Sequence, residues 1–120
     1  MGTFTVALTV QGPTGESASV DALVDTGSTY AVLPAALLQR MGVTPKDRMS
    51  FRLADERVVD YDLGEVVAGL DGRERTVLVV FGPDDAAPLL GAVTLELFGM
   101  SVDPLGQRLV PVEGLLKGRR

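Results

Sequence analysis

The residues that could do chemistry gather in one segment, Ala22-Leu23-Val24-Asp25-Thr26-Gly27-Ser28-Thr29. Apolar residues lead into the acidic Asp25, which is followed by a hydroxyl residue and a glycine. An apolar strand that ends in a tight loop would hold a carboxylate at its end, where it can act as a general acid or base. The glycine would let a substrate backbone approach closely. The same residues also suit an ordinary Asp-Thr-Gly turn, so the segment alone leaves both interpretations open.

The composition narrows this chemistry, because the chain has no cysteine and no histidine. These absences exclude a thiol nucleophile, a Ser-His-Asp triad and a zinc site bound by cysteine or histidine. Hydrolysis would have to use carboxylates, hydroxyls, lysine or a metal bound by oxygen. The adjacent pair Asp84 and Asp85 lacks the spacing of a calcium loop, and we interpret it as part of a solvated loop. We therefore expect neither a metal nor a cofactor.

Charge and hydropathy indicate which partners to expect. The formal net charge is −5, with acidic and basic residues interspersed, so nothing would neutralise the phosphates of a nucleic acid. The longest aliphatic or aromatic run, residues 77–81, is far too short to span a membrane. The first ten residues have neither a basic start nor a long apolar core. We expect a cytoplasmic protein that binds neither nucleic acid nor membranes.

The other residues predict a mainly β domain that would position Asp25. Residues 3–10 alternate polar and apolar side chains, as in a half-buried strand, and a turn at 12–15 leads to a second strand over 17–24. This hairpin runs directly into Asp25. Further strands are predicted over 31–33, in hairpins with turns at 54–57 and at Asp71-Gly72, and over 101–112; short helices are predicted over 35–41 and 93–98.

The chain, residues 1–120, is interpreted as a single domain. It is too short for two ordinary domains and contains no linker, low-complexity block or internal repeat. Pro34 is expected at the first position of the first helix, which Gly42 would end. For residues 113–120 the sequence leaves three alternatives open: a flexible tail, an ordered end, or an end exchanged between subunits.

The order of these motifs resembles that of the retropepsin-like (clan AA) aspartic proteases, especially the small stand-alone prokaryotic type. The resemblance covers essentially the whole chain. It consists of the hairpin into Asp25-Thr26-Gly27, then Val32-Leu33-Pro34, a hairpin with Leu53-Ala54-Asp55 in the place of the flap, and Pro88-Leu89-Leu90-Gly91 before the second helix. The first motif is moderately specific and the last is weak alone, so their order carries the resemblance.

This resemblance implies a closed β-barrel-like retropepsin fold with one or two short helices and one Asp-Thr-Gly loop per subunit. The catalytic residues would be Asp25, Thr26 and Gly27. Because the chain has one such loop, a homodimer would supply two Asp25 carboxylates, which activate a water to hydrolyse a peptide bond. Thr26 would hydrogen-bond to the partner's backbone. The residues expected to contact the substrate are Ser28, Thr29, Ala54, Asp55, Glu56, Leu89, Leu90 and Gly91.

Three points in this assignment have alternatives. Relatives often carry Ala-Asp-Gly at the flap tip, where this chain has Ala54-Asp55-Glu56, so an ordinary exposed hairpin is the alternative to a mobile flap. Leu90 could equally pack in the core. The Ser28 hydroxyl, if it donates to the Asp25 carboxylate, would favour its ionised form.

The leading functional hypothesis is a homodimeric aspartic endopeptidase that cleaves extended peptides with apolar side chains beside the cut. The first alternative is a non-catalytic homodimeric module that binds peptides without cutting them. The second is a monomeric β domain in which the Asp-Thr-Gly motif is fortuitous.

Overall fold

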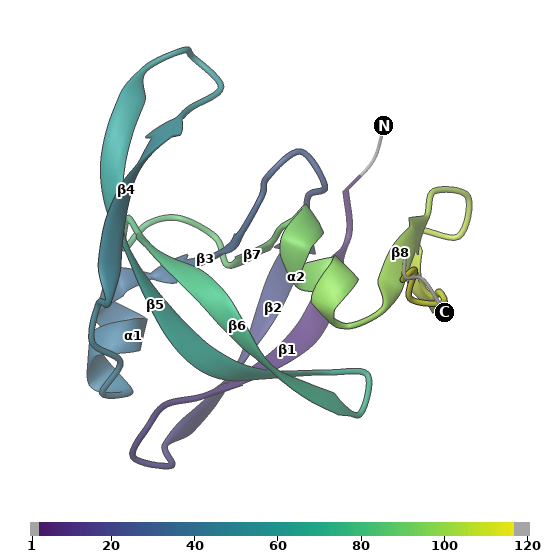
Figure 1. The fold of residues 1–120 in the computed structure, drawn as a ribbon, viewed down its shortest axis with the longest axis horizontal. Coiled ribbons are helices and arrows are strands. Elements are labelled where there is room, and N and C mark those ends of the chain that lie inside the picture. The colour runs from purple at the N-terminus through teal and green to yellow at the C-terminus, as the bar shows by residue number, and fades with distance from the viewer. Residues whose placement is uncertain (1–2, 117–120) are drawn as a thin grey trace.

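Two strands bring the chain to Asp25 in the computed structural model, which describes residues 3–116 (Figure 1). β1 (Thr5–Gln11) pairs antiparallel with β2 (Ser17–Val24), and their inward side chains include the buried Leu8 and Val10. β1 begins later than the alternation predicted, because its first paired residue is Thr5, opposite Leu23. β2 has the predicted bounds and ends immediately before Asp25.

The strands form a closed barrel because β1 pairs on both of its edges. The other strands of the ring are β3 (Ala31–Pro34), β5 (Val58–Leu70), β6 (Arg73–Gly82) and β7 (Leu89–Leu90). The ring runs β1-β2-β7-β3-β6-β5, and residues 67–69 of β5 pair with residues 9–11 of β1 to complete it. Among residues 3–116, β4 (Asp47–Arg52) pairs only with β5 and lies outside the ring. This is the mainly β, closed barrel that the sequence predicts.

The turn between β5 and β6 follows directly from its two residues. Asp71 and Gly72 have φ values of 52° and 78°. A two-residue hairpin turn with both φ values positive matches the twist of the flanking strands, and aspartate followed by glycine favours it. The turn sets a long antiparallel register, from Leu70 opposite Arg73 to Leu63 opposite Val80. β6 therefore forms a fixed wall of the barrel.

Helix α1 (Ala35–Arg40) begins at the start of the predicted range 35–41 and ends one residue earlier, but Pro34 is not its first helical residue. Pro34 is the last residue of β3 and has a ψ of 134°, so it precedes the helix instead of forming its first turn. Parallel pairing of Pro34 with Gly82 explains this, since the φ of proline suits an extended strand as well as a helix. Asp84 accepts a hydrogen bond from the Ala36 N–H (2.9 Å) and so caps α1. Gly42 follows the helix with a φ of 78°.

The last part of the chain forms a second helix and a hairpin beside the barrel (Figure 1). α2 (Ala92–Leu97) is followed by Gly99, which has a φ of 67°, and then by β8 (Met100–Asp103) and β9 (Arg108–Pro111). These two strands pair with each other in a separate sheet. Of the expected tail, residues 113–116 are exposed, and 117–120 lie outside the described residues.

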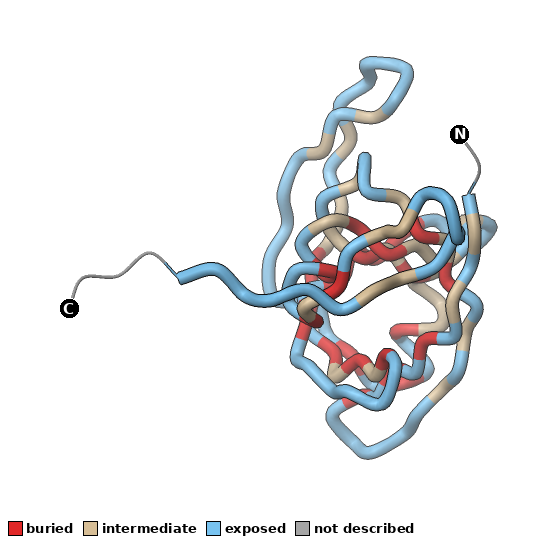
Figure 2. Tube along the Cα trace, turned by 90° about the vertical axis from the view of Figure 1, so that its right-hand side faces the viewer, coloured by how far each residue is buried: buried red, intermediate tan, exposed pale blue. Residues whose placement is uncertain are grey.

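The core fills the barrel and the space beneath the helices, whereas the end of the β4–β5 hairpin and residues 113–116 are exposed (Figure 2). Aliphatic side chains dominate the core. Neither described helix has the length and apolar character needed to cross a membrane. The largest fully buried side chains are those of Phe98, Leu8, Leu33, Leu38 and Leu90.

Candidate active site

Asp25 lies at the start of a loop, residues 25–30, that we call the Asp25 loop. The end of β2 is held from both sides: the Val24 N–H donates to the Phe4 carbonyl (2.9 Å) and the Asp25 N–H to the Leu90 carbonyl (3.0 Å). The Ser28 N–H donates to the Asp25 carbonyl (3.1 Å), which closes a tight turn. The backbone at Val24 and Asp25 is therefore fixed by Phe4, which precedes it in the sequence, and by Leu90, which follows it.

The Asp25 side chain is half-buried, and its carboxylate has one hydrogen-bond donor among residues 3–116. The Gly27 N–H donates to Oδ1 (2.9 Å), which leaves Oδ2 without a partner in this part of the chain. The Ser28 hydroxyl makes no hydrogen bond to the carboxylate, contrary to the sequence-based hypothesis. Thr26, Gly27 and Thr29 are exposed on the same loop.

Gly91 allows helix α2 to approach the Asp25 loop. A Cβ atom at Gly91 would lie 2.6 Å from the Tyr30 carbonyl oxygen and 2.7 Å from that of Ser28. The next two amides use this closeness: the Ala92 N–H donates to the Ser28 carbonyl (2.7 Å) and the Val93 N–H to the Thr29 carbonyl (2.9 Å). Two of the N–H groups that a helix start leaves unpaired thus support the loop. Gly91 itself is buried and supports the site from behind.

The β4–β5 hairpin projects beyond the barrel (Figure 1). Its turn is closed by the Leu53 N–H, which donates to the Arg57 carbonyl (2.8 Å), and by the Glu56 N–H, which donates to the Leu53 carbonyl (3.0 Å). Glu56 has a φ of 70°, in the left-handed region that favours glycine. Glycine would adopt this φ without the steric cost that the Glu56 side chain brings.

Charged side chains surround this turn. Arg57 Nε lies 2.7 Å from Asp55 Oδ2, and the Arg57 N–H donates to Asp55 Oδ1 (3.1 Å). These bonds, the Arg57 side chain foremost, lower the pKa of Asp55 below its ordinary value of 3.8. On one face of the hairpin, Arg48 pairs with Asp62 (2.9 Å). Such exposed pairs each contribute little, so the turn depends mainly on its backbone hydrogen bonds.

A pocket of about 250 Å³ lies between the Asp25 loop and the β4–β5 hairpin. Residues 27–30 line one side and residues 51–53 another. Its aromatic side chains contact one another: the Tyr30 and Phe51 rings meet edge to face with centroids 6.1 Å apart, and the Tyr61 ring lies 6.1 Å from Phe51. Val32 and Val80 add aliphatic surface. The pocket suits a bulky apolar group beside the Asp25 loop.

Seven of the eight predicted substrate contacts fall into three groups, and the eighth, Gly91, is buried behind the Asp25 loop. Ser28 and Thr29 line the pocket, together with the predicted catalytic Gly27. The exposed end of the β4–β5 hairpin contains Ala54, Asp55 and Glu56, and these residues do not line the pocket. Leu89 is half-buried and Leu90 fully buried in the core, so for Leu90 the structure shows the alternative role of core packing.

Sequence reasoning missed the aromatic lining of this pocket. Tyr30 comes from the Asp25 loop, whereas Phe51 and Tyr61 come from β4 and β5. Alternation along the hairpin could have identified Phe51 as an inward-facing residue, since neighbouring positions on a strand face opposite sides. No local signal connects Tyr30 with these two residues.

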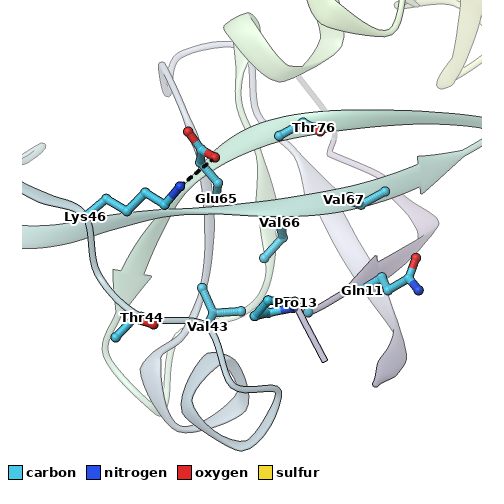
Figure 3. A pocket seen from close by; sticks show the side chains of 10 residues that line it. Gln11, Pro13, Val43, Thr44, Lys46, Glu65, Val66, Val67 and Thr76 are labelled. Carbon is cyan, nitrogen blue, oxygen red and sulfur yellow. Dashed lines mark hydrogen bonds and ion pairs between the residues drawn. The ribbon is translucent and has the colours of Figure 1, made fainter. Parts of the chain in front are cut away.

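Figure 3 shows a second hollow of similar size, about 270 Å³, whose lining includes no residue of the Asp25 loop. Pro13, Val43 and Val66 line it, and the ion pair between Lys46 and Glu65 (3.1 Å) lies at its side. None of the predicted site residues contributes to it. Within residues 3–116, no three acidic side chains come together as metal ligands. The Asp25 loop and its pocket are therefore the candidate active site.

Comparison with known proteins gives a consistent result. A family model described as "aspartyl protease" matches residues 6–93, from β1 to the start of α2. No curated protein sequence shows a significant match.

Among solved structures, the solution structure of simian foamy virus (mac) protease is similar, with a TM-score of 0.56, 20% identity and coverage of 76% of this chain and 90% of that one. EIAV protease complexed with the inhibitor HBY-793 gives a TM-score of 0.55, 20% identity and coverages of 88% and 90%. A retropepsin-like aspartic protease from Rickettsia conorii gives a TM-score of 0.54 and 16% identity, with coverage of 86% of this chain and 89% of that one. At these identities the likeness shows the fold alone.

Proposed function

Because this chain belongs to the aspartyl protease family and has a retropepsin-like fold, we propose that it is an aspartic endopeptidase that acts as a homodimer. The observation that carries the proposal is the Asp25 loop, in which a half-buried carboxylate is fixed by backbone hydrogen bonds beside exposed residues. The chain has a single Asp-Thr-Gly sequence. A second carboxylate therefore has to come from Asp25 of a second copy, related by twofold symmetry.

Two such carboxylates would share one proton, because two like charges a few ångströms apart cannot both ionise cheaply. The ionised Asp25 takes a proton from a bound water, and the water oxygen attacks the peptide carbonyl carbon. The protonated Asp25 of the other subunit donates its hydrogen bond to the carbonyl oxygen. Transfer of a proton to the peptide nitrogen then breaks the C–N bond and releases the amine. The Gly27 N–H on Oδ1 keeps each carboxylate oriented during these steps.

The substrate in this proposal is an extended peptide with a bulky apolar side chain near the scissile bond. The pocket between the Asp25 loop and the β4–β5 hairpin supports this, since Tyr30, Phe51 and Tyr61 provide an aromatic wall. Burying a large apolar side chain there would contribute about 1.5 to 3 kcal/mol. The hydroxyl residues Ser28 and Thr29 at the same pocket can hydrogen-bond to the peptide backbone.

The test is cleavage of a diverse peptide library between pH 3 and 8 by the wild type and by Asp25→Asn, with the molecular mass of each measured in solution. We expect the wild type to be dimeric and to cut beside bulky apolar residues, and the Asn variant to fold and dimerise without cutting. The substitution keeps the size of the side chain but removes the acid, so loss of turnover reports on chemistry.

Other outcomes would contradict the proposal in different ways. A folded dimer that binds peptides without cutting them at any pH would support the non-catalytic module. A monomer without activity would leave the Asp-Thr-Gly loop as a structural turn. Cleavage that persists in Asp25→Asn would show that another group, or a contaminant, does the chemistry.

A further inference from the structure

Helix α2 has only six residues and cannot stabilise its own ends. It has no side-chain hydrogen bond at its N-cap and no basic residue in its last turn. Short helices depend on contacts from outside, because each end leaves backbone groups unpaired. At the amino end, the Ala92 and Val93 amides donate to the Ser28 and Thr29 carbonyls of the Asp25 loop. The position of the loop is thus tied to that of the helix.

At the carboxyl end, two arginines of β6 bind the last carbonyls. Arg73 Nη1 donates to the Phe98 carbonyl (2.8 Å) in a partly buried contact, and Arg75 Nε donates to the Leu97 carbonyl (3.2 Å). The Arg75 guanidinium also lies 6.0 Å from the centroid of the fully buried Phe98 ring. Positive charge is favourable at this end of a helix, and these donors pair carbonyls that the helix itself leaves free.

The strand that carries these arginines also fixes the other end of the loop. β3, which follows the Asp25 loop, pairs in parallel with β6 from Ala31 opposite Val79 to Pro34 opposite Gly82. Arg73 and Arg75 are two residues apart, so they project from the same face of β6. The β6 backbone thereby holds β3, into which the Asp25 loop leads. Two β6 side chains hold α2, which supports the loop.

We propose that Arg73 and Arg75 are positioning residues for the proposed reaction: by holding the carboxyl end of α2 against β6, they fix the Asp25 loop in its active position. The inference rests on the proposed function. Catalysis by paired carboxylates requires their placement to a fraction of an ångström, and a displacement of about 1 Å can lower the rate by about a hundredfold. Loosening α2 would let the Ser28 and Thr29 carbonyls move.

The test compares the wild type with Arg73→Met and Arg75→Met, singly and together. Methionine keeps much of the apolar stem while removing the donors. We expect the double variant to lower kcat by about tenfold and to leave KM within about twofold, since the peptide pocket contains neither arginine. Arg73→Lys retains one donor group and should recover part of the loss. The matched control is Arg40→Met, at the exposed end of α1, which should keep wild-type kinetics.

A second measurement does not depend on activity: amide hydrogen exchange of the folded proteins. We expect the Ala92 and Val93 amides to exchange at least tenfold faster in the double variant, with the amides of β1 and β2 unchanged. Unchanged exchange at Ala92 and Val93, an equal loss of protection throughout the barrel, or a wild-type kcat in the double variant would each overturn the proposal. A wild type that does not cut peptides would refute the proposed function, while the exchange data would still decide whether the arginines hold the loop.

Discussion

Replacing Gly91 with alanine should damage the active site through a steric conflict that the structure defines closely. The added Cβ would lie 2.6 Å from the Tyr30 carbonyl oxygen, 2.7 Å from that of Ser28 and 2.7 Å from the Thr29 carbonyl carbon. Ordinary contacts begin near 3.4 Å, so the backbone of α2 and that of the Asp25 loop must separate by several tenths of an ångström. No flexible side chain can absorb the change, because all three atoms are backbone atoms.

Two effects set the size of the expected loss in the free energy of unfolding. Overpacking a well-packed site costs about 1 to 3 kcal/mol. Lengthening the bonds from the Ala92 and Val93 amides to the loop adds up to about 1 kcal/mol for each bond that is lost. We therefore expect Gly91→Ala to lower the free energy of unfolding by about 3 kcal/mol. The displaced loop should also lower kcat/KM by about a hundredfold in molecules that remain folded.

The assay is urea unfolding followed by circular dichroism at one fixed protein concentration, with peptide cleavage measured well below the unfolding transition. Two glycines provide controls. Gly114→Ala places its Cβ in open space and should change neither quantity. Gly12→Ala would press on the Met41 carbonyl far from Asp25, so it should lower stability while the folded fraction keeps its activity. A Gly91→Ala variant within about 0.5 kcal/mol of the wild type and fully active would refute the reasoning.

Two further predictions concern the end of the β4–β5 hairpin. Glu56→Gly should raise the free energy of unfolding by about 0.5 to 1 kcal/mol, because glycine adopts the φ of 70° without strain. Glu56→Ala, which keeps the Cβ, should give no such gain in the same urea assay. Equal effects of the two substitutions would contradict the argument. Arg57→Gln should raise the pKa of Asp55 toward 3.8, as followed by the NMR shift of its carboxyl carbon. Because the pKa of Asp55 is lowered in the folded state, its contribution to the stability of the hairpin is fully present above about pH 3.8 and is lost as the pH falls through the folded-state pKa. An unchanged Asp55 titration in the variant would exclude Arg57 as the cause of the lowered pKa.

Much of the fold could be predicted because its signals are local. Alternating side chains identified β1 and β2, and Asp71-Gly72 identified the turn between β5 and β6. Gly42 and Gly99, both with positive φ, follow α1 and α2 as expected of glycine at helix ends. Pro34 was misplaced at the start of α1 because its φ suits both states, and pairing with Gly82 in a distant strand selects the extended one.

Other features have no local signal. β7 has only two residues, yet it pairs with both β2 and β3 and completes the barrel wall beside Asp25. Closure of the ring depends on pairing between β1 and β5, in which the paired residues are 56 to 60 positions apart in the sequence. The aromatic pocket likewise joins Tyr30 to the hairpin residues Phe51 and Tyr61. Contacts between distant segments depend on how the whole barrel closes, which no short pattern encodes.

The sequence by itself determined the chemistry that this protein can attempt. Without cysteine or histidine, the side chains that could catalyse hydrolysis narrow to groups such as carboxylates. Because the chain has a single Asp-Thr-Gly sequence, the proposed pair of carboxylates would need a second copy of the chain. The tertiary structure decided where that carboxylate is held. The Asp25 loop is held by the Leu90 carbonyl and by the Ala92 and Val93 amides. The supporting helix α2 is held in turn by the β6 arginines. These groups come together only because the barrel closes. Backbone groups are the same in every residue, so their partners follow from the fold, not from the residue types.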